Sequence, residues 1–229
     1  YSSAASDVYK RQVQIMYPII TISREFGSGG HSVGQKVAEE LGIPFYDSEL
    51  VDQVAKRSGY TKAVINEQGE YTDKMSKWFS VSMAPAMYFE NPQDEIFKAQ
   101  KRVILDCAEE GPCVIVGRCA DYILDQEAYP TLNVFIHADM PHRISRVLER
   151  YGDTEVDVRK RLERKDRNRK TYYRYYTDRE WGKYTNYQIN LDSGYLGVDQ
   201  CVRIIVDTVR AMDHGNDTAE QKTDGKNKA

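Results

Sequence analysis

The chain has 229 residues, of which 41% are hydrophobic, and its formal net charge is −3. This length and composition allow one sizeable core and do not require two full domains. No apolar run approaches the roughly 18 residues of a membrane helix, and the N-terminus lacks the apolar segment of a signal peptide, so we expect a cytoplasmic protein without a membrane partner.

The two ends of the chain differ from its middle. Residues 1–16 show no clear periodicity, and we interpret them as a disordered leader or added segment outside the fold. Residues 213–229 are almost purely polar and cannot cover a core, which predicts a disordered tail. The folded domain is therefore expected to span residues 17–212.

Between these limits, strand-like apolar runs alternate with helical patterns, which favours a mainly parallel five-stranded sheet covered by helices on both sides. The predicted strands are 19–23, 43–46, 113–116, 132–137 and 187–191. The predicted helices are 33–41, closed by Gly42, and 48–57, 94–109, 141–151, 156–174 and 198–212. Residues 58–92 are poorly periodic, and their aromatic side chains either form a mobile insertion over a site or pack under a helix.

The four cysteines are spaced like neither a zinc site nor the disulfide framework of a secreted protein. They are Cys107, Cys113, Cys119 and Cys201. We expect buried free thiols.

The strongest chemical signal is an apolar run, Ile19 to Ser23, that breaks into a glycine-rich turn and then a helix. Glycines let backbone N–H groups converge on an anion, and the helix N-terminus adds partial positive charge. The turn, with Gly27, Ser28, Gly29 and Gly30, is therefore predicted to hold phosphates. The usual Gly-Lys-Ser/Thr ending reads Gly-Gly-His-Ser here, so the lysine is absent.

Another cation must balance the phosphate charge, and Arg24 and His31 are the nearest candidates in the sequence. Arg24 is alternatively a solvent-facing strand end, and His31 a surface residue at the start of a helix. Ser32 either offers its hydroxyl to Mg²⁺ or caps the helix.

Two further strands end in charged residues. Asp47 follows the second strand, and Arg118 follows the third, where it could clamp a substrate phosphate with its forked donors. Ligands of open α/β sheets bind at the carboxyl ends of the strands, so both residues point to the same edge as the glycine loop.

Residues 159–174 are the most basic part of the chain, with nine Lys or Arg against two acids. Arg164, Arg167 and Arg174 recur at roughly helical spacing, compatible with one face that closes over phosphates. Neighbouring tyrosines could instead stack on RNA bases, but the net charge of −3 argues against a dedicated nucleic-acid binder.

Four segments together resemble the cytidylate kinase-like proteins, relatives of the bacterial CMP kinases among the P-loop nucleoside monophosphate kinases. They are residues 23–30 (SREFGSGG), 42–47 (GIPFYD), Gly117-Arg118, and the stretch from Asp166-Arg167 to the tyrosine-rich residues 172–176. The resemblance extends over about residues 18–212. It implies a three-layer P-loop kinase fold with an acceptor-binding insertion near residues 50–100 and a helical lid near 155–185.

The resemblance also implies roles for individual residues. Residues 27–32 would hold the phosphates of ATP, Asp47 would lie near the acceptor, and Arg118 would grip it. Arg164 and Arg167 would be lid arginines that neutralise the transferring group. Gly30 stands in place of the loop lysine, and Cys119 in place of the aspartate of a Gly-Arg-Asp motif.

The sequence thus predicts an ATP- and Mg²⁺-dependent nucleoside monophosphate kinase whose acceptor is a small phosphate such as CMP or dCMP. Two alternatives remain open. A small-molecule kinase of the same fold would phosphorylate a hydroxyl and could use Asp47 as its base. A non-catalytic nucleotide-binding regulator would account directly for the missing lysine.

Overall fold

The computed structural model describes residues 18–47, 92–152 and 154–224. At its centre is a five-stranded sheet whose strands are all parallel, in the order β2-β3-β1-β4-β5. The strands are β1 (Ile19–Arg24), β2 (Phe45–Tyr46), β3 (Val114–Val116), β4 (Thr131–His137) and β5 (Ile189–Asp192). The predicted parallel sheet is confirmed.

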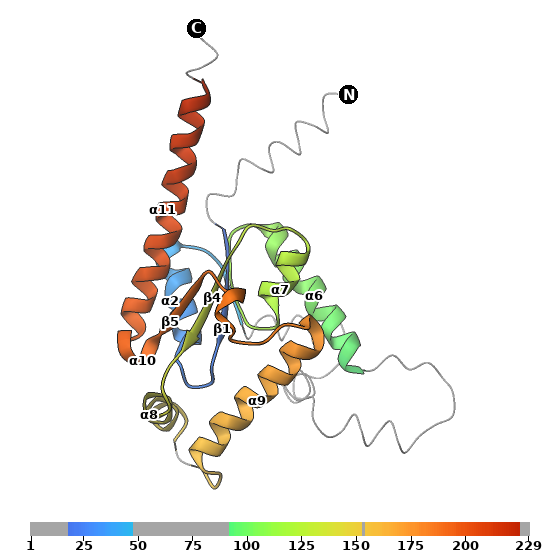
Figure 1. Ribbon diagram of the computed structural model, residues 1–229, viewed down its shortest axis with the longest axis vertical. Helices are drawn as coiled ribbons and strands as arrows, with labels where there is room; N and C mark the ends of the chain where they lie inside the picture. The colour runs from blue at the N-terminus through green and yellow to red at the C-terminus, as the bar shows by residue number, and fades with distance from the viewer. Residues whose placement is uncertain (1–17, 48–91, 153, 225–229) are drawn as a thin grey trace, which may run out of the picture.

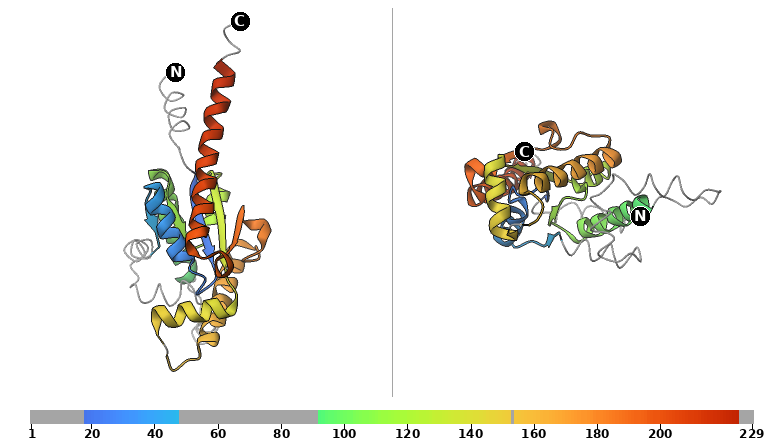
Figure 2. Two further views of the ribbon diagram at one scale, coloured as in Figure 1. Left: turned by 90° about the vertical axis from the view of Figure 1, so that its left-hand side faces the viewer. Right: turned by 90° about the horizontal axis from the view of Figure 1, so that it is seen from below.

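Helices cover both faces of this sheet (Figure 1). On one face lie α2 (Gly30–Leu41) and α11 (Val198–Asp224), and on the other lie α6 (Pro92–Glu110) and α7 (Ala120–Gln126). Beyond the ends of the strands lie α8 (Met140–Tyr151) and α9 (Val158–Thr177), as Figure 2 also shows. A 3₁₀ turn, η1 (Tyr184–Asn186), precedes β5, and the short helix α10 (Ser193–Leu196) follows it.

The core has two halves, one on each side of the sheet. Along β1, Ile19 packs with α6 and α7, whereas Ile20 and Ile22 pack with α2 and α11. Strands of a parallel sheet covered on both faces are apolar on both sides, because no face meets water. This explains the continuous apolar runs that predicted the strands.

Several boundaries differ from the sequence prediction. Helix α7 was not predicted, because it is short and follows a turn without a side-chain cap. The predicted helix 48–57 and residues 58–91 lie outside the described residues. Residues 92–100 of the expected insertion instead begin α6, where Ile96 and Ala99 are buried in the core.

The backbone of α11 is helical to Asp224, beyond the predicted end at Met212. Among the α11 side chains whose burial is described, which end at Met212, the last buried one is Val209, and the helix then extends away from the body of the molecule (Figure 1). All four cysteines are buried and free, as predicted. In the part of the chain that the structure describes, no helix combines the length and apolar character needed to span a membrane.

We expect Ile22→Ala to lower the free energy of unfolding by about 2–5 kcal/mol, because the Ile22 side chain of β1 is fully buried against α2 and its truncation leaves a cavity. Val156→Ala is the control, since Val156 is exposed before α9, and it should change stability by less than about 0.5 kcal/mol. Urea unfolding followed by circular dichroism measures both. Equal effects of the two substitutions would contradict the core assignment.

Candidate active site

The glycine-rich loop joins β1 to α2 at the carboxyl edge of the sheet. Gly27 and Gly29 have φ angles of 80° and 82°, a left-handed conformation that glycine adopts without strain. Ser28 is fully buried, and its hydroxyl donates to the carbonyl oxygens of Glu25 at 2.9 Å and Ile136 at 3.1 Å. The Ser28 side chain therefore fixes the loop to β4 and is turned away from any ligand on the loop.

The start of α2 differs from the starts of α8, α9 and α10. Asp139, Asp157 and Asp192 cap α8, α9 and α10 with their carboxylates. In α2 the N-cap is Gly29, which makes no side-chain cap, and the first turn contains no acid. No carboxylate of the loop or of the first turn of α2 therefore caps the positive end of the helix dipole, which suits a phosphate site.

Arg24, the last residue of β1, lies against the backbone of two glycines. A Cβ atom on Gly30 would lie 2.5 Å from the Cβ of Arg24, and a Cβ on Gly117 would lie 1.9 Å from its Nη1. The first distance leaves no space for a side chain on Gly30, because the Cβ of Arg24 is fixed to its backbone. The second distance shows that the guanidinium end of Arg24 lies against Gly117. Arg24 therefore extends from the first residue of α2 to the end of β3, and it passes through the space that a side chain on Gly30 would need.

Asp47 contacts two side chains beside the loop, Arg24 and His31. Its carboxylate lies 3.5 Å from Nη2 of Arg24 and 3.2 Å from Nε2 of His31. The predicted neighbours of the loop, Arg24 and His31, are thus brought together by the predicted acid of the second strand. Desolvation by burial lowers the pKa of His31, and the nearby Arg150 and Arg24 lower it further, against the opposing effect of Asp47.

Arg24 also lines a pocket. Arg118 and Arg169 line it together with Arg24, so three guanidinium groups approach the same space. The remaining lining residues are Ser23, Gly117, Cys119, Tyr172, Tyr173 and Trp181. Three cations beside aromatic walls suit a compact anion attached to a flat or apolar group.

The turn after β3 brings Arg118 to the pocket in a strained backbone conformation. Gly117, Arg118 and Cys119 have consecutive positive φ angles of 79°, 59° and 57°. Left-handed conformations of residues other than glycine cost energy and cluster at functional sites. Burial raises the pKa of the Cys119 thiol, so a neutral group lies where the related motif has an aspartate.

The tyrosine hydroxyls of the pocket wall already have partners. Tyr172 donates to Gln100 at 2.5 Å, and Tyr173 donates to the buried Asp121 at 2.6 Å. Burial raises the pKa of Asp121. Because Tyr172 and Tyr173 are buried in the core, they do not form the exposed stacking surface that RNA binding would require.

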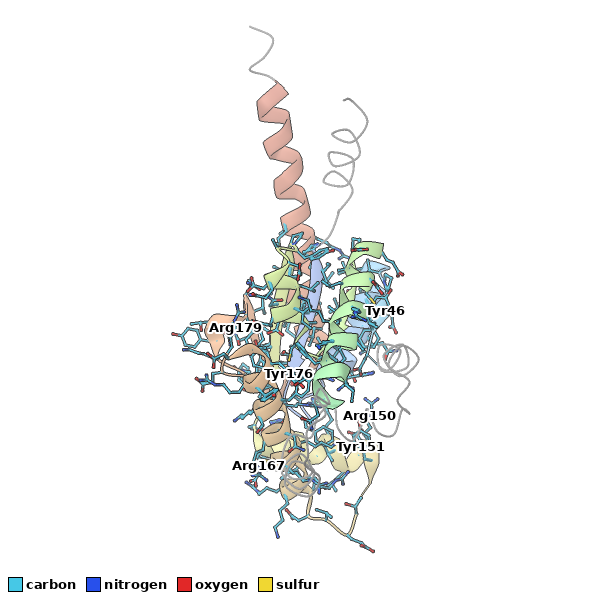
Figure 3. The ribbon with its side chains drawn as sticks, turned by 90° about the vertical axis from the view of Figure 1, so that its right-hand side faces the viewer. Tyr46, Arg150, Tyr151, Arg167, Tyr176 and Arg179 are labelled. Carbon is cyan, nitrogen blue, oxygen red and sulfur yellow. The ribbon has the colours of Figure 1, made fainter. Side chains whose placement is uncertain are left out.

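Two arginines of α8, which the sequence analysis did not single out, approach the loop. Arg146 donates from Nη1 to the carbonyl oxygen of Gly27 at 3.0 Å, and Arg150 donates from Nη1 to the hydroxyl of Ser32 at 3.4 Å. Figure 3 shows Arg150 near the end of α8. The signal was present in the sequence, since Arg143, Arg146 and Arg150 recur at helical spacing in the predicted helix 141–151.

Helix α9 presents an arginine to the pocket that differs from the two predicted. Arg164 and Arg167 are exposed, with Arg167 visible on α9 in Figure 3. Arg169 shares the inward face with Leu162 and Tyr173, which are buried at helical spacing from it. Those apolar residues were the signal that could have distinguished Arg169 within the basic run.

The residues at the loop fit a magnesium ion that takes most of its ligands from phosphates and water. Mg²⁺ in kinases is held by one or two protein oxygens, with phosphates and water completing its shell. The Ser32 hydroxyl lies in the first turn of α2 and is such an oxygen. Among the described residues, no group of three His, Cys, Asp or Glu side chains forms a dedicated metal site.

The strand order, the glycine loop after β1 and the arginine-lined pocket define a P-loop kinase fold. Solved structures agree: the fold resembles that of shikimate kinase from Acinetobacter baumannii in complex with shikimate, at 12% identity and a TM-score of 0.50, over 88% of this chain and 97% of that one. An uncharacterized protein from Eubacterium ventriosum is 31% identical, with a TM-score of 0.63, over 84% of this chain and 98% of that one.

The chain belongs to the cytidylate kinase-like family, whose family model matches residues 19–195. It is 24% identical over 192 residues to the cytidylate kinase of Archaeoglobus fulgidus, which covers 83% of this chain and 93% of the relative. The matched region contains the glycine loop, Asp47, Arg118 and α9. The predicted family and fold class are therefore confirmed.

We expect the stability of the wild type to fall more steeply below pH 6.5 than that of His31→Gln. Burial lowers the pKa of His31 from 6.5, so the unfolded chain binds a proton at His31 more readily than the folded chain. The stability that the neutral His31 side chain contributes is therefore present above pH 6.5 and is lost as the pH falls. Glutamine can still donate to Asp47. Urea unfolding of both proteins across this range measures the difference, and identical pH dependences would contradict the burial of His31.

Proposed function

We propose that this protein transfers the γ-phosphoryl group of Mg·ATP to the phosphate of a small nucleotide of the CMP or dCMP type. The observation that carries this proposal is the position of Arg24, which connects the glycine loop with the arginine-lined pocket. A donor on the loop and an acceptor in the pocket would meet at that guanidinium. Phosphoryl transfer depends mainly on such positioning and on charge stabilisation.

The donor side consists of the loop and α8. Backbone N–H groups at the start of α2 would bind the ATP phosphates, and the Ser32 hydroxyl would contact Mg²⁺, which neutralises phosphate charge when bound. Arg150, which now donates to Ser32, and Arg146, which donates to Gly27, could turn to phosphate oxygens from these positions. Arginine suits this role because it stays charged and offers forked donors.

The acceptor side consists of Arg118 and Arg169. Their guanidinium groups would bind the acceptor phosphate, whose oxygen is already a nucleophile and needs no strong base. Asp47 would then orient Arg24 and His31 through the contacts that it makes in the structure. Arg164 and Arg167 would complete the site only if the α8–α9 region closes, as the predicted lid requires.

The family and the cytidylate kinase of A. fulgidus support the nucleotide acceptor. A hydroxyl acceptor is the alternative, because Asp47 lies at the edge where a base would be needed. Its carboxylate is occupied by Arg24 and His31, which favours an orienting role over proton abstraction. A regulator without turnover is the third possibility, since the loop lysine is absent.

Single-turnover transfer from Mg·ATP to CMP, dCMP, UMP, AMP and shikimate separates these functions. We expect transfer to the pyrimidine nucleotides, and we expect Arg118→Ala to raise the acceptor KM roughly 10- to 100-fold with little change in the ATP KM, since losing a charge-assisted contact costs about 1.5–3 kcal/mol. Arg203→Ala, an exposed arginine of α11, is the matched control. Transfer only to shikimate would support the hydroxyl kinase, and ATP binding without any transfer would support the regulator.

The role of Arg24 is tested by exchanging the cation between positions 24 and 30. We expect Arg24→Gly to lower kcat by roughly 10³-fold, by analogy with other catalytic arginines. Gly30→Lys alone should also be inactive, because its Cβ would overlap the Cβ of Arg24. The double variant removes the overlap and supplies a loop ammonium group, so its kcat should exceed that of either single variant. A double variant no better than Arg24→Gly would show that Arg24 does not fill the role of the loop lysine.

A further inference from the structure

Phe26, in the glycine loop, has both of its backbone polar groups bonded to charged side chains from outside the loop. Its N–H donates to Oδ1 of Asp166 on α9 at 2.8 Å, and its carbonyl oxygen accepts from Nε of Arg143 on α8 at 2.8 Å. Two helices that follow β4 therefore hold the two successive peptide groups of the loop that flank the Cα atom of Phe26. The position of these groups depends on both helices as well as on β1.

The charges that hold Phe26 are buried and bonded to one another. Arg143 is 5% exposed and Asp166 is 9% exposed, and Nη2 of Arg143 donates to Oδ2 of Asp166. Nη1 of Arg143 also lies 3.3 Å from Oε2 of Glu25, the residue before Phe26. Removing one member of such a buried group leaves an uncompensated charge, so its geometry is strongly maintained.

Helix α9 reaches the acceptor pocket about one turn after Asp166, at Arg169. Arg169 lines the pocket, donates from Nη1 to the carbonyl oxygen of Arg24 at 3.0 Å, and lies 5.7 Å from the ring centroid of Phe26. Phe26 also has an aromatic neighbour, Tyr151, whose ring is stacked on it at 6.1 Å between centroids. Helix α9 thus contacts the pocket through Arg169 and the loop through Asp166 and Arg169.

We infer that Arg143 and Asp166 are positioning residues that couple binding of an anion in the acceptor pocket to the conformation of the glycine loop. The identity of the two ligands rests on the proposed function. An acceptor phosphate that binds Arg169 adds a contact that holds α9 in this position, and the Asp166 bond passes that restraint on to the N–H of Phe26. The coupling is reciprocal, because each ligand must change the affinity for the other by the same factor.

The ligand-free protein provides the first test. Hydrogen–deuterium exchange is measured on peptides that cover residues 24–30 in the wild type, Asp166→Asn and Asp178→Asn. Asparagine at 166 keeps the shape but removes the charge that pairs with Arg143, so we expect faster exchange in the loop. Asp178→Asn removes the same charge from the same helix at an exposed ion pair with Arg174, 3.3 Å long, and should exchange like the wild type.

The second test measures coupling with Mg·ADP and CMP, two ligands that cannot react with each other. Calorimetry gives the affinity for Mg·ADP with and without saturating CMP. We expect CMP to tighten Mg·ADP binding by at least about 5-fold in the wild type and in Asp178→Asn, within the usual range of coupling between sites. In Asp166→Asn we expect the ratio to approach one while each ligand alone still binds, which a purely structural role would not produce.

If Asp166→Asn does not fold, Arg143→Lys replaces it in both tests, because it keeps the charge balance and removes the forked bonds to Phe26 and Glu25. The inference is overturned if the folded variant retains both the loop exchange and the coupling ratio of the wild type. A wild type that transfers phosphoryl groups in that case leaves the proposed function intact. A wild type that binds neither Mg·ADP nor CMP overturns both the proposed function and the coupling.

Discussion

The contact of Arg24 with two glycine backbones is the constraint on which the rest of the site depends. Gly30 has no space for a Cβ atom because of the Cβ of Arg24, and the guanidinium group of Arg24 occupies the space beside Gly117. This contact fixes how closely the start of α2 and the end of β3 approach β1. The glycine loop, the strained turn at Arg118 and the acid Asp47 all take their places around that one side chain.

The site is rich in positive charge although the chain as a whole is weakly acidic. In a chain with a net charge of −3, arginines of β1, the β3–α7 turn, α8 and α9 gather at the carboxyl edge of the sheet. Asp47 and Asp166 compensate part of this charge by pairing with Arg24 and Arg143. Guanidinium groups suit such a site, since they remain charged when partly buried and bind two oxygens at once.

The buried contacts of α9 also limit how this region can close. Asp166 and Arg169 bind the backbone of the loop, whereas Arg164 and Arg167 lie on the exposed face of the same helix. The whole helix cannot swing without breaking buried charge-assisted bonds.

The sequence by itself determined the parallel sheet, the glycine loop, the family and the edge of the sheet after whose strands Asp47 and Arg118 follow. These follow from local signals: apolar runs, turn residues and the rule that the carboxyl ends of parallel strands share one edge. Only the tertiary structure showed that Arg169, and not Arg164 or Arg167, lines the pocket, that Ser28 points into the core, and that Arg143 holds the loop. These facts depend on tertiary packing, because packing decides where a side chain points and which residue, more than a hundred positions away, it bonds. No local pattern in the sequence contains that information.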